Sequence, residues 1–238
     1  MKRRDGRKPD ALRDIAIEKS FLNNAHGSAL ITWGSTRVIC SAMYKTGVPP
    51  FLEGTGKGWL TAEYAMLPGS TQQRKQREKG RPDGRGTEIS RLIGRSLRSV
   101  FDIKAVPDYT IHIDCDVIDA DGGTRTASIT GAYIAVTECI DNMIAGGLIE
   151  SSPIREGFAA VSCGVVSDVP LIDLDYSEDS RADADMNIVM AHGGGIIEVQ
   201  GTGERRPMQR GELDTLLAYA QEGIKQIQQI QKEALGQA

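Results

Sequence analysis

The amino-acid sequence predicts an α+β protein made of two similar halves, about residues 1–150 and 151–238. In each half, strand-like patterns come first and a long helical pattern follows. The chain has 238 residues, of which 40% are hydrophobic and 25% charged, enough for a sizeable core in one domain or two closely packed lobes. We therefore expect mixed sheets packed with helices.

The individual elements follow from hydrophobic periodicity and from turn residues. In the first half, strands are predicted at 13–18, 27–33, 36–44 and 109–118, and helices at 87–101 and 126–145. Gly34-Ser35 forms a two-residue hairpin turn, and Gly146-Gly147 ends the second helix. In the second half, strands are predicted at 158–166, 170–174, 186–191 and 196–200, and a final helix at about 210–234.

A glycine-rich turn is the most informative local motif. The strand 109–118 places Ile111, Ile113, Cys115 and Val117 on one face and breaks at Gly122-Gly123, before a helical pattern that starts at Thr126. Such a turn leaves backbone N–H groups free at a helix N-terminus, where an anion is favoured. Thr124, Thr126 and Ser128 add hydroxyls, and Arg125 adds a forked cation suited to phosphate oxygens. The alternative is an ordinary helix start with Arg125 in solvent.

An acidic segment follows in the second half. Residues 173–185 hold six acids in thirteen residues, between two strand-like runs. Carboxylates at the ends of strands suit Mg²⁺, which takes oxygen ligands and keeps several waters. Asp173, Asp175 and Asp183 are expected to be surface charge. Asp179 and Asp185 are the candidate site residues, because six residues can carry the chain out of one pocket and back into it. Together with a phosphate turn, they suggest phosphoryl transfer.

A basic segment indicates a polyanionic substrate. Residues 74–95 carry a net charge of +5 in a chain whose net charge is −4. Residues 72–86 contain no apolar side chain and four Gly or Pro residues, which predicts a mobile surface loop. Basic loops on acidic proteins bind polyanions locally and with salt dependence, although an isolated charge run is often only solvated.

Several blocks in the same order closely resemble the bacterial ribonuclease PH family. They are GWLTAEY (58–64), EISRLIGR (88–95), DCDVIDADGGTRTASITG (114–131), LDYSED (174–179) and IEVQGT (197–202). The resemblance covers nearly the whole chain. It implies one domain over residues 1–238, with a two-lobed, duplicated β-β-α-β fold like that of ribosomal protein S5 domain 2.

The resemblance also implies an activity and site residues. Members of the family are phosphate-dependent 3′-to-5′ exoribonucleases that trim tRNA precursors, release nucleoside diphosphates and form a hexameric ring. By resemblance, Arg85, Gly123, Thr124 and Arg125 bind phosphate, Asp179 and Asp185 are catalytic and associated with Mg²⁺, and Arg74 and Arg77 hold tRNA. Inorganic phosphate would attack the last phosphodiester, and Asp185 or a metal-bound water would protonate the leaving oxygen. The reverse reaction, nucleotide addition, is expected from the same site.

The sequence departs from the family pattern at a few positions. Gly69 stands where the family usually has an arginine after Met-Leu-Pro, which removes one expected RNA contact. Gly86 follows Arg85 and is expected to loosen the loop that holds this arginine. Arg181 and Ala184 lie between the two aspartates and replace what are commonly a small residue and a threonine. None of these changes removes a catalytic group carried over from the family.

Other features limit the remaining alternatives. Cys40, Cys115, Cys139 and Cys163 are far apart and lie in apolar stretches, so we expect buried thiols. The charged N-terminus lacks a signal-peptide pattern, and no run is long enough to span a membrane, which favours a cytoplasmic protein. Two other functions remain open. One is a catalytically idle RNA-binding ring subunit of exosome-core type, and the other is a magnesium-dependent enzyme acting on small nucleotides.

Overall fold

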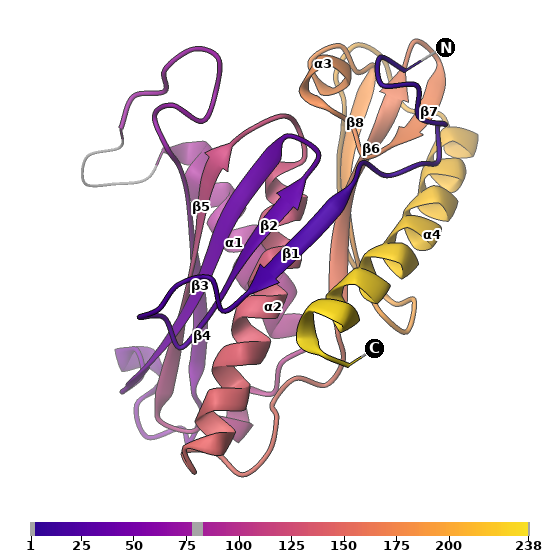
Figure 1. Cartoon of the computed structure of the whole chain (residues 1–238). Helices are drawn as coiled ribbons and strands as arrows, with labels where there is room; N and C mark the ends of the chain where they lie inside the picture. The colour runs from indigo at the N-terminus through magenta and orange to yellow at the C-terminus, as the bar shows by residue number, and fades with distance from the viewer. Residues whose placement is uncertain (1–2, 78–82, 238) are drawn as a thin grey trace.

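The computed structural model describes residues 3–77 and 83–237, which form two sheets with a long helix between them (Figure 1). The first sheet has the order β1-β2-β3-β5-β4. Its strands are β1 (Ile15–Lys19), β2 (Gly27–Trp33), β3 (Thr36–Thr46), β4 (Trp59–Met66) and β5 (Tyr109–Asp119). Neighbouring strands are antiparallel except β4 and β5, which are parallel. Helix α1 (Gly84–Ser99) connects these two strands, because a parallel pair requires a crossover.

The second sheet is antiparallel throughout, in the order β7-β6-β8-β9. Its strands are β6 (Phe158–Val166), β7 (Val169–Ile172), β8 (Ala184–Ala191) and β9 (Ile196–Gly203). Helix α3 (Tyr176–Asp179) lies between β7 and β8 in the chain, and helix α4 (Arg210–Leu235) packs against this sheet. Two 3₁₀ turns, Pro50–Leu52 and Ile103–Ala105, complete the connections.

Helix α2 (Thr124–Ala145) joins the two lobes into one core. Sixteen of its 22 residues are buried, and it contacts β2 and β3 on one side and β6 on the other. A helix that is apolar nearly all round is stable only when protein covers it on several sides. One cluster of buried side chains therefore runs through both sheets.

The predicted α+β class, with mixed sheets packed with helices, is confirmed. The strands at 27–33 and 158–166 have the predicted bounds, and the four cysteines are buried free thiols as expected. Strand β4 and helix α3 were not predicted. In the part of the chain that the structure describes, no helix combines the length and the apolar character needed to cross a bilayer.

Several predicted boundaries differ from the structure by one to three residues, and two of them have an evident local cause. Helix α1 begins at Gly84, not at residue 87, because the Asp83 side chain caps it by accepting a hydrogen bond from the Gly86 amide. The strand predicted to reach residue 174 ends at Ile172, since Asp173 turns the chain with a left-handed φ of +54°.

Candidate active site

A single cavity of about 630 Å³ lies where the glycine turn of the first lobe meets the acidic segment of the second. Its lining comes from both lobes and includes Arg74, Arg85, Gly122, Gly123, Thr124, Arg125, Ser162, Asp179, Asp185 and Asn187. The two motifs are about sixty residues apart in sequence. The structure nevertheless brings them to one cavity, as the proposed chemistry requires.

The glycine turn connects β5 to α2 and presents its backbone to the cavity. Gly122 and Gly123 have φ values of +76° and +68°, which glycine adopts without steric cost. A Cβ at Gly122 would lie 2.4 Å from the carbonyl oxygen of Leu174. This position must therefore lack a side chain for the turn to pack against the second lobe. Within residues 3–77 and 83–237, no group accepts a hydrogen bond from the amides of Gly122, Gly123, Thr124 or Arg125. Four donors at a helix N-terminus are thus available to an anion.

Of the three hydroxyl residues predicted to line the turn, only Thr124 lines the cavity. Thr124 lines the cavity, and its Oγ1 lies 2.9 Å from the buried Tyr64 hydroxyl. Thr126 instead donates to the Gly123 carbonyl, and Ser128 is fully buried, so neither adds to the phosphate cradle. Their interpretation as cradle hydroxyls was wrong, because the almost completely buried helix α2 directs both into the protein.

Arg125 is held in place by Glu88 of helix α1. Its Nη2 lies 2.8 Å from Glu88 Oε2, and Gln200 donates to the other oxygen of the same carboxylate at 3.0 Å. Burial alone would raise the pKa of Glu88, but the hydrogen bond from Gln200 and the charge of Arg125 outweigh burial and lower it. The Arg125 Nε is buried and has no partner among the described residues. Sequence reasoning gave Glu88 no role.

Arg85 was predicted in a mobile loop, and this placement was wrong. It is an exposed residue in the first turn of α1, two residues after the capping Asp83, and it lines the cavity. Gly86, expected to loosen this region, is buried in the same turn and its amide is bonded by Asp83. A helix therefore carries Arg85.

The two candidate aspartates come from different elements of the second lobe. Asp179 ends α3 and Asp185 lies near the start of β8. Although the Asp179 side chain reaches solvent, the pKa of its carboxyl is raised, first because the surrounding protein limits its hydration and second because Asp185 repels a second negative charge. Arg85 and Arg125 act in the opposite direction on the same pKa. The two acids and the two arginines therefore share one electrostatic environment.

The prediction that Asp173 is surface charge was wrong. Its side chain is 1% exposed and accepts hydrogen bonds from Arg7 and Arg13 of the N-terminal segment. Asp175 caps α3 in a reciprocal capping box with Glu178, and the buried Glu178 forms a two-point ion pair with the buried Arg3, at 2.7 and 2.8 Å. Arginines 160 or more residues away in sequence thus support the segment that carries Asp179.

The basic segment only partly reaches the cavity. Arg74 is exposed and lines the cavity, whereas Arg77 is exposed and lies outside the lining. Lys75 forms an ion pair with Asp83, 3.3 Å apart, and so connects this segment to the start of α1. Lys79 and Arg81, which contributed to the predicted charge, lie outside the described residues.

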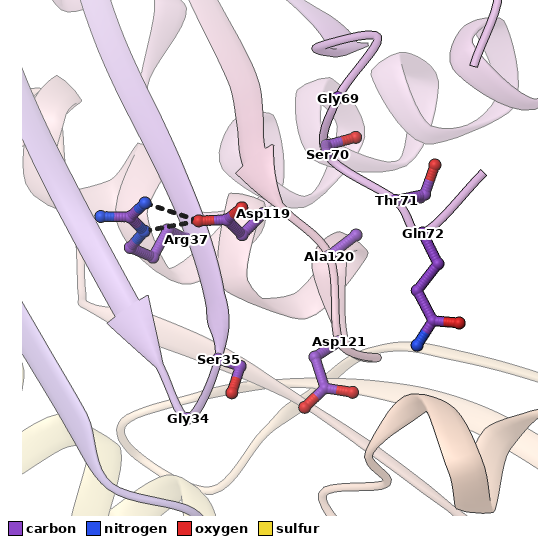
Figure 2. Close-up of a pocket in the computed structure, with 10 residues that line it drawn as sticks. All are labelled: Gly34, Ser35, Arg37, Gly69, Ser70, Thr71, Gln72, Asp119, Ala120 and Asp121. Carbon is purple, nitrogen blue, oxygen red and sulfur yellow. Dashed lines mark hydrogen bonds and ion pairs between the residues drawn. The ribbon is translucent and has the colours of Figure 1, made fainter. Parts of the chain in front are cut away.

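A second cavity of about 530 Å³ adjoins the first and shares Thr71, Gln72, Ala120 and Asp121 with it (Figure 2). In it, Arg37 pairs with Asp119 at 2.6 Å, and both side chains are about half exposed. Gly69 lines this cavity, and a Cβ added there would meet nothing within 4 Å. Open space therefore surrounds Gly69, the position where the resemblance leads us to expect an arginine, beside the first cavity.

Comparison with known proteins agrees with this architecture. Two models of the 3′ exoribonuclease family match the chain, domain 1 over residues 11–139 and domain 2 over residues 158–223. The chain therefore belongs to the 3′ exoribonuclease family.

Solved structures with this fold include exosome proteins. Rice (Oryza sativa) Rrp46 aligns with a TM-score of 0.80 at 20% identity, over 98% of this chain and 100% of that chain. A chain of the Archaeoglobus fulgidus exosome with RNA bound to the active site gives 0.83 at 22% identity, over 96% and 92%. A chain of an archaeal exosome core gives 0.79 at 21% identity, over 98% and 91%. At these identities the likeness concerns the fold.

Sequence reasoning missed several lining residues. Ser162 of β6 and Asn187 of β8 face the cavity, and Tyr176 of α3 lies at its edge with 57% of its surface exposed. Ser162 and Asn187 are in register across the β6–β8 pair, so they lie side by side. The available signal was a polar residue within a mostly apolar strand, and such residues also occur in buried sheets that bind no ligand.

Proposed function

We propose that the protein is a phosphate-dependent 3′-to-5′ exoribonuclease of the ribonuclease PH type, which trims the 3′ ends of tRNA precursors. The main supporting observation is one cavity that has Arg85, Arg125 and four backbone amides on one side and Asp179 and Asp185 on the other. These amides have no acceptor among the residues that the structure describes. Phosphoryl transfer needs mainly this combination of positioning and charge neutralisation.

In the proposed reaction, inorganic phosphate binds the amides of the glycine turn. Arg125, oriented by Glu88, and Arg85, carried on α1, neutralise its charge. One phosphate oxygen forms a bond to the terminal phosphorus of the RNA while the bond to the 3′-oxygen breaks. The terminal nucleotide leaves as a nucleoside diphosphate, and the departing 3′-oxygen takes a proton from the carboxyl pair or its bound water. The bond formed is a phosphoanhydride, so the reverse reaction, nucleotide addition, is expected from the same site.

The carboxylate pair fits a magnesium ion. Asp179 and Asp185 face one cavity, and a bound cation would offset the burial and the repulsion by Asp185 that together raise the pKa of Asp179. Among the described residues, no cluster of three or more acids, histidines or cysteines could hold a metal. Two carboxylates would thus leave positions for water and substrate oxygens, as Mg²⁺ prefers. When bound, Mg²⁺ would neutralise charge between two approaching anions.

The substrate and the assembly are the finer parts of the proposal. Arg74 at the cavity and Arg77 nearby suit the backbone of an RNA whose 3′ end enters the site. The exosome chain from Archaeoglobus fulgidus, which shares the fold, is described with RNA bound to the active site. A homohexameric ring would cover exposed apolar side chains such as Phe51, Ile196 and Val199, which are 67%, 56% and 42% exposed. We also propose that the protein is located in the cytoplasm.

A catalytically idle RNA-binding ring subunit is the second candidate, because chains of archaeal exosomes share this fold. The two candidate functions differ in whether the site catalyses a reaction. An idle subunit has no need for free amides, two arginines and two acids in one cavity. Their presence together favours the enzyme.

The decisive experiment incubates the purified protein with a 3′-extended tRNA and Mg²⁺, with or without inorganic phosphate. Phosphorolysis predicts shortening only with phosphate, and nucleoside diphosphates as products on thin-layer chromatography. Shortening without phosphate, with monophosphates released, would show hydrolysis instead. Binding of the tRNA without any shortening would indicate the idle subunit.

A further inference from the structure

Two residues that do not line the cavity form hydrogen bonds to the glycine turn. They are Arg13, in the segment before β1, and Thr36, at the start of β3. The Arg13 side chain is 7% exposed, and Thr36 is fully buried. Neither was singled out by the sequence motifs.

Arg13 joins the turn to the acidic segment. Its Nη1 donates to the carbonyl of Asp121, and its Nη2 lies 3.4 Å from the carbonyl of Gly122. The same guanidinium donates to both carboxylate oxygens of Asp173, with Nη2 at 2.8 Å and Nε at 3.1 Å. One planar group therefore spans the two motifs that form the cavity.

Thr36 holds the same two residues without any charge. Its Oγ1 donates to the carbonyl of Gly122 at 2.7 Å and accepts a hydrogen bond from the amide of Asp121 at 2.9 Å. Because Thr36 is buried, water cannot replace these bonds if the hydroxyl is removed.

The geometry of the peptide bond turns these contacts into an orientation for the cradle. In a trans peptide, the C=O of one residue and the N–H of the next point in opposite directions. The carbonyls of Asp121 and Gly122 point towards Arg13 and Thr36, so the N–H groups of Gly122 and Gly123 point the other way. Both glycines line the cavity, whereas Arg13 and Thr36 do not, and from this difference we infer that the cavity lies on that opposite side.

We propose that Arg13 and Thr36 are positioning residues that aim the amides of Gly122 and Gly123 at the attacking phosphate. This inference rests on the proposed function, because it assigns the turn to inorganic phosphate. It adds that residues outside the cavity fix the affinity for phosphate, while the affinity for RNA depends on other groups. A glycine turn has few conformational restraints of its own, so its amides keep one direction only when neighbouring groups hold it.

The test compares two threonines with the same bonding pattern. Thr36→Val removes the hydroxyl that bonds the turn. Thr130→Val is the matched control, because Thr130 is also fully buried, and its Oγ1 bonds the carbonyl and the amide of Ala160, away from the cavity. Thr36→Ser keeps the hydroxyl and should restore the wild-type behaviour. Phosphate KM, RNA KM and kcat are measured on a 3′-extended tRNA, and phosphate binding is measured by calorimetry.

We expect Thr36→Val to raise the phosphate KM and the phosphate dissociation constant about tenfold, the usual loss for one hydrogen bond to a charged group. The RNA KM should stay within about twofold, and Thr130→Val should leave all constants near the wild-type values. A general loss of folding would affect the two valine variants alike, which thermal unfolding of each measures. Equal phosphate constants in Thr36→Val and Thr130→Val would overturn the proposal.

Failure of the proposed function can be told apart from failure of this inference. If the wild-type protein binds phosphate without trimming RNA, the enzyme assignment fails, and the ratio of phosphate constants between Thr36→Val and wild type still decides the positioning role. If wild type trims RNA with phosphate and Thr36→Val has an unchanged phosphate KM, only the positioning role fails. Arg13→Lys keeps the charge but loses the planar fork and should also raise the phosphate KM. An unchanged phosphate KM in that variant would remove Arg13 from the proposal.

Discussion

The two walls of the 630 Å³ cavity differ in their chemistry. One wall is backbone: the amides of Gly122 to Arg125, at the start of a long buried helix. The other wall consists of side chains: Asp179 at the end of the four-residue helix α3, and Asp185 on β8. The first wall offers donors fixed by peptide geometry, whereas the second offers charges whose protonation depends on their neighbours.

The walls also differ in how the rest of the protein supports them. Uncharged Thr36 and the guanidinium of Arg13 hold the backbone wall. The segment behind Asp179 depends on buried charge pairs, Arg3 with Glu178 and Arg13 with Asp173. Arg13 belongs to both supports, so the two walls are mechanically connected. From this difference we expect changes to the backbone wall to affect phosphate binding. Changes to the carboxylate wall should affect the chemical step or stability.

The largest effect is expected from the carboxylate wall. Asp185→Asn keeps the shape of the side chain but removes the charge, and should lower kcat on 3′-extended tRNA by about a thousandfold or more. Asp183→Asn is the control, because Asp183 is a half-buried acid two residues away that does not line the cavity. It should retain activity within about twofold. A kcat for Asp185→Asn above a tenth of the wild-type value would remove Asp185 from the mechanism.

A stability effect is expected where the two walls meet. Asp173→Asn leaves the buried Arg13 without its counter-charge and should lower the free energy of unfolding at pH 7 by about 3 kcal/mol, measured by urea denaturation. Asp214→Asn provides the control. Its ion pair with Arg210 on α4 is largely exposed, so the loss should be below about 0.5 kcal/mol.

The same variant predicts a pH dependence. Burial alone would raise the pKa of Asp173, but Arg13 outweighs it and holds the pKa below its usual range. A lowered folded-state pKa contributes stability above the unfolded pKa of about 3.9, and this contribution is lost as pH falls through the folded value. The difference between wild type and Asp173→Asn should therefore be constant from about pH 5 to 8 and shrink below about pH 4. A constant difference down to pH 3 would contradict the ionised pair.

How much of this site the sequence predicts depends on whether the contacts are local. The glycine turn is readable because strand, Gly-Gly and helix follow one another within twenty residues. Arg125 and the pair Asp179 and Asp185 were placed correctly in one cavity by motif and family resemblance. Their individual roles remain predictions.

The errors share one physical cause, which is distance along the chain. Asp173 resembles surface charge because its partner Arg13 lies 160 residues earlier, and Glu178 pairs with Arg3 over 175 residues. Thr126 and Ser128 looked like cradle hydroxyls because local sequence does not show that protein covers α2 on nearly all sides. Gly84 and Gly86 have a low helix propensity and therefore predicted a loop. The helix starts at Gly84 nevertheless, because the Asp83 side chain caps it.

Substitutions of Arg125 and Glu88 should have a smaller effect. They test separately the positive charge at the backbone wall and its orientation. Arg125→Lys keeps a positive charge but loses the fork that pairs with Glu88 and phosphate, and should raise the phosphate KM about tenfold or somewhat more. Glu88→Gln removes the counter-charge that orients Arg125 and should give a smaller increase of the same kind. Steady-state kinetics at several phosphate concentrations measure both. A fall in kcat without a change in phosphate KM would place Arg125 on the chemical step instead.

The smallest effect is expected outside both walls, at the basic segment. Changing Arg74 and Arg77 together to Ala should weaken tRNA binding severalfold and flatten the plot of log affinity against log salt by about 1.5 units of slope, since each phosphate contact contributes about 0.7–0.9. Both side chains are exposed, so stability should not change. Arg210 and Lys225 of α4, exposed at 83% and 57%, give a matched double-Ala control. If that control flattens the slope equally, the basic segment holds no RNA of its own, and the RNA path must be sought along the second cavity at Gly69 and Arg37.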